Sequence, residues 1–189
     1  MNALQASAGI FDSARLERVF NACFGAAFNT RLVGGADEPL YRPAADGQGE
    51  NLLFYRADYF ASALHETAHW CIAGAQRRRQ VDFGYWYEGD GRGPQQQRAF
   101  QAVEARPQAL EWFFSRACGW PFRVSLDNLQ GAGELPDSAG FRRQVAACAL
   151  QWQARGLPAR AAQFYDALCA AFGTDTAADR LRFDAADIG

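Results

Sequence analysis

The segment that decides how this chain folds runs from Tyr59 to Gly74 and reads YFASALHETAHWCIAG. His65 and His69 stand four residues apart, so on a helix both imidazoles lie on one face, one turn from each other. A second stripe on the same helix is apolar and consists of Leu64, Ala68, Cys71 and Ile72. The segment therefore predicts a helix, capped by Asp58, that is anchored in a core and presents two histidines to a metal ion.

The histidines belong to an HExxH motif and are the only two of the chain. Glu66 lies between them and is the candidate catalytic residue, because a carboxylate beside a metal-bound water can take its proton. Two histidines need at least one further ligand, and because the chain has no third histidine we expect it to be a carboxylate. The downstream candidates are Asp82, Glu88, Asp90, Glu104 and Glu111.

Glu104 is the first choice for the third ligand, and Glu111 is the alternative or a supporting residue. Both fall in a predicted helical run that begins at Pro94. Glu104, Gln108 and Glu111 share one helix face unless Pro107 kinks the helix or starts a second one. A carboxylate on such a helix can reach the ion if the helix packs against the HExxH helix.

The donor set leaves two kinds of metal centre open. Two histidines and one carboxylate suit zinc in a hydrolase, with a position left for water. The same groups form the facial triad of non-haem Fe(II) oxygenases. Glu66 slightly favours hydrolysis, because peptide hydrolysis needs a base beside the metal-bound water.

Hydrophobic periodicity predicts more helix than strand in the rest of the chain. The predicted helices cover residues 13–28, 94–118, 138–154 and 158–172, and the predicted strands cover residues 30–33, 52–55 and 81–87. Residues 39–51 are predicted to form a loop, and the tail from Gly173 is predicted to fray. Strand and helix do not alternate regularly, which favours the α+β class, with a helix-rich single domain and a small mixed sheet.

Length and composition narrow the class of protein. A chain of 189 residues fits one domain, residues 1–189, with about ten N-terminal and about fifteen C-terminal residues peripheral. The net charge of −2 provides no basic field for nucleic acid. Five cysteines without CxxC spacing indicate reduced thiols and a cytoplasmic protein. No apolar run approaches the roughly 20 residues that span a membrane.

Several runs, taken in order, resemble the elongation factor P hydroxylase family. They are FNTRLVGGADEPLY (28–41), YFASALHETAHWCIAG (59–74), VDFGYWY (81–87), VEARPQALEW (103–112) and GWPFRVSLDNL (119–129). The resemblance implies a non-haem iron, O₂-dependent monooxygenase that acts on the lysine of elongation factor P that already carries a β-lysyl group. It also implies a fold like that of the metal-dependent endoribonuclease of ribosome maturation.

The resemblance carries metal ligation over to His65 and His69, with Glu104 as the match for the third ligand. Glu66 then accepts a hydrogen bond from bound water or from the substrate ammonium, and the electron donor is unassigned. A pocket for a long cationic side chain needs carboxylates and aromatic faces. Its candidate substrate-binding residues are Asp82, Tyr85, Trp86 and Tyr87.

Two alternatives belong to other classes. One is a zinc metallopeptidase of the HExxH type with a distal glutamate, and the other is a metal-stabilised binding module without chemistry. Arg77, Arg78 and Arg79 are candidates for contact with an acidic protein partner; solvated charge at a helix end is the simpler interpretation.

Overall fold

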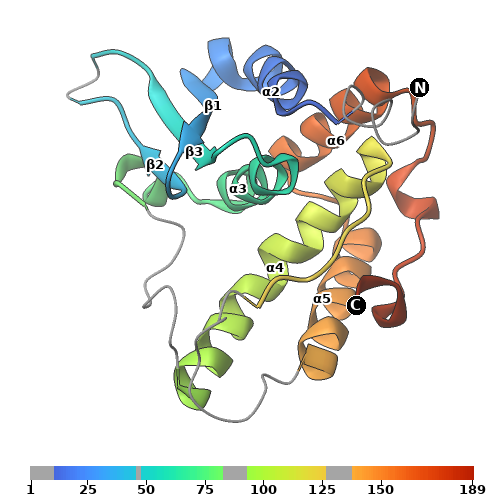
Figure 1. The fold of residues 1–189 in the computed structure, drawn as a ribbon. Helices are drawn as coiled ribbons and strands as arrows, with labels where there is room; N and C mark the ends of the chain where they lie inside the picture. The colour runs from blue at the N-terminus through green and yellow to red at the C-terminus, as the bar shows by residue number, and fades with distance from the viewer. Residues whose placement is uncertain (1–10, 46–47, 83–92, 127–137) are drawn as a thin grey trace, which may run out of the picture.

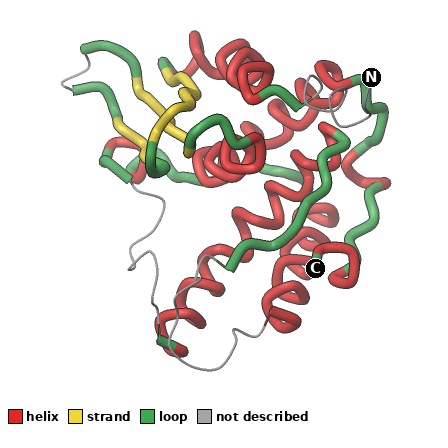
Figure 2. The backbone as a smooth tube through the Cα atoms, viewed as in Figure 1, coloured by secondary structure: helices red, strands yellow, loops and turns green. Residues whose placement is uncertain are grey.

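The computed structural model describes residues 11–45, 48–82, 93–126 and 138–189, and for Pro94 it describes the backbone only. Five α-helices and three strands fall in these ranges, together with three short 3₁₀ helices. In chain order they are α2 (Ser13–Phe28), β1 (Thr30–Ala36), β2 (Leu40–Arg42), β3 (Asn51–Arg56), α3 (Phe60–Ile72), η1 (Arg77–Arg79), α4 (Pro94–Cys118), α5 (Ser138–Arg155), α6 (Ala159–Phe172), η2 (Ala178–Arg180) and η3 (Ala185–Ile188). The strands gather on one side of the molecule and helices fill the rest (Figure 2). This confirms the α+β class.

The sheet has the strand order β1-β3-β2, with β1 parallel and β2 antiparallel to β3. Side chains alternate between the faces, so Leu32, Tyr41 and Leu53 point inward and are buried. Helices α2 and α3 pack on this inner face (Figure 1). The predicted loop over residues 39–51 is wrong in part, because β2 lies within it.

Helix α3 lies between the sheet and the long helix α4 (Figure 1). It begins at Phe60 after Tyr59 and has no side-chain cap, so the predicted capping by Asp58 is wrong. Trp70 fixes α3 against α2, since its ring lies 4.8 Å from that of Phe24 and 5.2 Å from that of Phe20. Leu64, Ala68 and Cys71 of the apolar stripe are also buried, so the stripe anchors the helix in the core, as predicted.

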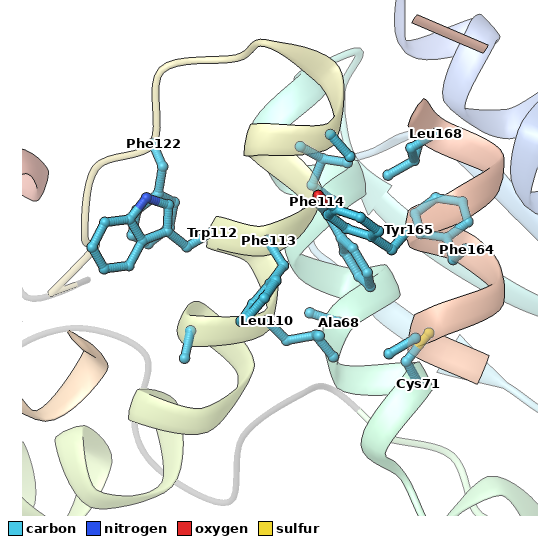
Figure 3. Packing of buried hydrophobic residues seen from close by; sticks show 14 of the residues in the cluster. Ala68, Cys71, Leu110, Trp112, Phe113, Phe114, Phe122, Phe164, Tyr165 and Leu168 are labelled. Atoms are coloured by element: carbon cyan, nitrogen blue, oxygen red, sulfur yellow. The ribbon is translucent and has the colours of Figure 1, made fainter. Parts of the chain in front are cut away.

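Helix α4 runs unbroken from Pro94 to Cys118 with Pro107 inside it. Pro107 lacks the N–H that would reach the carbonyl of Val103, yet the helix continues because its C-terminal half is held by packing. Figure 3 shows side chains from α3, α4 and α6 meeting in this core, among them Phe113, Phe114 and Phe164. The uninterrupted helix keeps Glu104 and Glu111 in one register.

The ends of the described chain differ from the predictions in one respect. Asp12 caps α2 by accepting a hydrogen bond from the backbone N–H of Ala14. The predicted fraying of the tail is wrong, because Phe183 and Ile188 are buried against the core. Most of the predicted strand over residues 81–87 lies outside the described residues. Of the helices that are described, none is both long and apolar enough to cross a bilayer.

Candidate metal centre

Three donor groups converge between α3 and α4. The Nε2 atoms of His65 and His69 lie 3.0 Å apart. Oε2 of Glu104 lies 3.3 Å from Nε2 of His65, and Oε1 of Glu104 lies 3.3 Å from Nε2 of His69. All three ligand atoms lie within 4.8 Å of one another, so the group can hold a metal ion. The helical spacing of the histidines and the packing of α4 on α3 produce this convergence.

Burial makes the carboxylate of Glu104 dependent on nearby positive charge. The residue is 2% exposed, and among the described residues its Oε2 accepts no well-directed hydrogen bond. Burial opposes ionisation, but the neighbouring imidazoles of His69 and His65 hold the pKa of the Glu104 carboxyl well below its ordinary value. A buried, ionised oxygen without a directed donor is stabilised by a cation. This observation fits a bound metal ion.

Glu111 contacts the other nitrogen of His65. Its Oε2 lies 2.8 Å from Nδ1, so the Nδ1–H group can donate to Glu111 and leave the Nε2 lone pair for a metal. Burial alone would lower the pKa of the His65 imidazole, but its contacts with Glu104 and Glu111 raise it well above its ordinary value. The site thus favours positive charge at the point where the three donors meet.

These contacts separate the two glutamates that the sequence left as alternatives. Glu104 approaches both Nε2 atoms, whereas Glu111 approaches Nδ1 of His65 on the far side of the ring. Gln108, on the same face of α4, exchanges two hydrogen bonds with the backbone of Ser125, at 2.7 and 3.0 Å. Glu104 and Glu111 therefore share the helix face that meets His65, whereas Gln108 bonds to the backbone of Ser125.

A pocket opens directly beside the donor group. Its wall includes the metal-site residue His69, and it also includes Tyr41, Leu53, Glu66, Trp70, Ala73, Arg77, Arg78 and Asp82. Glu66 is 7% exposed, and burial raises the pKa of its carboxyl above the ordinary value. Of the three converging donors, His69 lines the pocket, and the carboxylates of Glu66 and Asp82 line it as well.

The structure brings some of the predicted substrate-binding residues to the pocket. Asp82 lines it, whereas Tyr85, Trp86 and Tyr87 lie outside the described residues. Sequence reasoning missed Tyr41 and Trp70. Trp70 directly follows His69 in the motif and was a detectable candidate, whereas Tyr41 reaches the pocket only through the pairing of its strand.

Fold and site together define an α+β protein in which two packed helices present two histidines and a glutamate to one point, the donor set of mononuclear metalloenzymes. The chain belongs to the elongation factor P hydroxylase family, whose sequence model matches residues 19–182. One relative is the elongation factor P lysine hydroxylase of Haemophilus influenzae. It is 43% identical over 166 residues, which cover 88% of this chain and 92% of the relative. The resemblance inferred from the ordered sequence runs is confirmed.

Proposed function

We propose that this protein hydroxylates the β-lysyl-modified lysine of elongation factor P, with O₂ as co-substrate and Fe(II) held by His65, His69 and Glu104. The observation that carries the proposal is the convergence of these three groups in a member of this family. The relative's name supports elongation factor P as the substrate and lysine as the target residue. Two histidines and one carboxylate leave coordination positions open for O₂ and substrate.

Iron in this site would supply the activation of O₂, and the chain supplies the surroundings. Glu104 contributes negative charge that partly neutralises a divalent cation. Glu111 holds the His65 ring by the Nδ1 contact of 2.8 Å, which fixes the direction of its Nε2 lone pair. Trp70 and Leu53 place apolar surface along the pocket and limit the access of water to the reacting carbon.

The pocket wall suits a cationic side chain. Glu66 and Asp82 can accept hydrogen bonds from ammonium groups, and Tyr41 and Trp70 provide aromatic surface. In this proposal Glu66 touches the substrate beside the metal and acts in positioning the reacting group. From their place in the sequence, Tyr85, Trp86 and Tyr87 are proposed to line the same pocket.

Family membership favours hydroxylation over the zinc metallopeptidase. The two functions predict different effects of Glu66→Gln. A peptidase loses cleavage of peptides because it loses its base. In the hydroxylase, the change weakens substrate binding and no peptide is cleaved by either form of the protein.

The test of the proposed function uses the full chain, loaded anaerobically with Fe(II) and then given O₂, a reductant and β-lysylated elongation factor P. Intact-protein mass spectrometry should show a product heavier by one oxygen atom. His69→Ala should abolish the product, and Glu50→Gln, an exposed substitution outside the pocket wall, should leave it unchanged. Absence of the product from iron-loaded wild-type protein would refute the proposal.

Three further expectations follow from family membership and are part of the proposal. Residues 1–189 act as one hydroxylase domain. The protein works in the cytoplasm, where translation factors are modified. Its fold is like that of the endoribonuclease of ribosome maturation. Superposition on a solved structure of that enzyme tests this expectation.

A further inference from the structure

In the pocket wall the carboxylate of Asp82 is already paired with a cationic side chain, that of Arg77. Nη2 of Arg77 donates to Oδ1 of Asp82 at 3.1 Å, and Nε of Arg77 donates to Oδ2. Both residues line the pocket that contains His69 and Glu66. A planar guanidinium that donates to both oxygens of a carboxylate satisfies the same acceptors that an ammonium group would use.

The two partners differ in how firmly they are held. Asp82 is fixed through its backbone, because it exchanges two hydrogen bonds with Tyr41, at 2.7 and 2.9 Å, on the edge of β2. Arg77 extends from the short helix η1, and its side chain is 40% exposed against 17% for Asp82. If the pair separates, Arg77 is therefore the partner that moves.

Arg77 also lies within the electrostatic influence of the metal site. The hydrogen bond with Asp82 raises the pKa of the Arg77 guanidinium, and the charge of Glu104 acts in the same direction. The Arg77 side chain is 40% exposed, so water can solvate its guanidinium when an incoming cation takes its place on Asp82, and this lowers the free-energy cost of the exchange.

We propose that Arg77 is a placeholder: it occupies Asp82 in the substrate-free protein and yields this carboxylate to an ammonium group of the substrate. The inference rests on the proposed function for the identity of the substrate. It assigns Asp82 as the residue that selects a cationic side chain and Arg77 as an internal competitor. Displaced from Asp82, the exposed guanidinium is free to contact acidic groups on the surface of the substrate protein.

The test compares binding of two uncharged-backbone probes, Nα-acetyl-lysine methylamide and its norleucine counterpart, to the full chain by NMR titration. Asp82→Asn should weaken binding of the lysine probe by about two- to fivefold. Arg77→Gln should strengthen it by a similar factor, roughly two- to fivefold, because the competitor is gone. The double variant should bind like Asp82→Asn, because Arg77 acts only through Asp82.

Arg79→Gln is the matched control, because it removes the same charge from the same short helix at an exposed position outside the pocket wall. It should leave the affinity unchanged, and the norleucine probe should not distinguish any of the variants. A structural ion pair predicts the opposite sign for Arg77→Gln: binding weakens in parallel with Asp82→Asn. That result, or no change in Arg77→Gln, overturns the proposal.

A second measurement needs no variant. In wild-type protein, saturation with the lysine probe should shift the Nε–H resonance of Arg77, whereas the norleucine probe should not. An unmoved resonance at saturation also overturns the proposal. Because both measurements follow binding alone, a protein that binds the lysine probe as predicted but adds no oxygen to elongation factor P would refute the proposed function and leave this inference standing.

Discussion

Replacing Glu111 tests how the proposed metal site is built. Glu111 is 8% exposed and contacts only one side of the His65 ring, 2.8 Å from Nδ1, while the three converging donors meet on the other side. Glu111→Leu removes the acceptor that fixes the direction of the His65 lone pair. Glu111→Gln keeps an acceptor oxygen at the same place but removes the negative charge.

The expected magnitude follows from the position of Glu111 outside the converging group. Loss of such a supporting partner typically lowers metal affinity about 10- to 100-fold, which is about 1.4 to 2.7 kcal/mol of binding free energy. Glu111→Leu should fall in this range and Glu111→Gln should lose less. Glu104→Gln should lose more than either, because Glu104 approaches both Nε2 atoms at 3.3 Å.

The assay is anaerobic titration of metal-free protein with Fe(II), and separately with Zn(II), against a competing chelator. Glu50→Gln is the control, since this exposed carboxylate pairs with Arg31 on the sheet. Circular dichroism verifies that each variant is folded. If Glu111→Leu binds metal as tightly as wild type, the supporting role is wrong. If Glu111→Gln loses as much as Glu104→Gln, Glu111 is itself a ligand.

Three further predictions concern stability. Gly34→Ala should destabilise the protein by about 1–3 kcal/mol in urea unfolding, because a Cβ there would lie 2.6 Å from Oη of Tyr55 and 3.0 Å from the carbonyl oxygen of Ala57. Gly25→Ala, where a Cβ meets nothing within 4 Å, is the control, and equal effects would contradict the argument. Arg160→Gln should lower stability by roughly 1–2 kcal/mol in thermal unfolding. The reason is that Nη2 of Arg160 donates to the carbonyl oxygens of Trp70, Cys71 and Ala73 at the end of α3. An unchanged Tm would show that these hydrogen bonds are dispensable. Burial raises the pKa of the Tyr55 hydroxyl from 10.0 to about 12, so its contribution to stability is complete below pH 10 and is lost as pH rises to about 12. Over that pH window the free energy of unfolding of wild type should fall by about 2–3 kcal/mol more than that of Tyr55→Phe. Parallel pH profiles of the unfolding free energy would refute the role of Tyr55.

The sequence predicted elements well where the signal was local. The helix over Ser13–Phe28 has a capping aspartate and an apolar stripe, and the HExxH helix has its own stripe, so both appear where expected. The strand β2 was missed because its three residues are too few to show alternation and are held by pairing with β3. The tail was misjudged because Phe183 and Ile188 are isolated apolar residues, which gain burial only when the core is already assembled.

Pro107 is a second position at which a local sequence rule fails, because the helix continues where the rule predicts an interruption. A proline in a helix interior predicts a kink or a break. The residues after Pro107 bury several aromatic side chains, and this burial outweighs the loss of one backbone hydrogen bond. The continuity of α4 in turn keeps Glu104 and Glu111 on one face at fixed separation. Their common face was predictable from spacing, provided that the helix did not break.

The sequence by itself determined the pair of histidines, because a separation of four residues on one helix brings two imidazoles together whatever the rest of the chain does. It also determined the family, through ordered runs that extend over most of the chain. Only the tertiary structure showed that Glu104, and not Glu111, approaches the Nε2 atoms of both histidines, because that choice depends on how α4 packs against α3. It alone placed Arg77 on Asp82 and brought Tyr41 into the pocket, since β2 and η1 meet there through packing that no local pattern encodes.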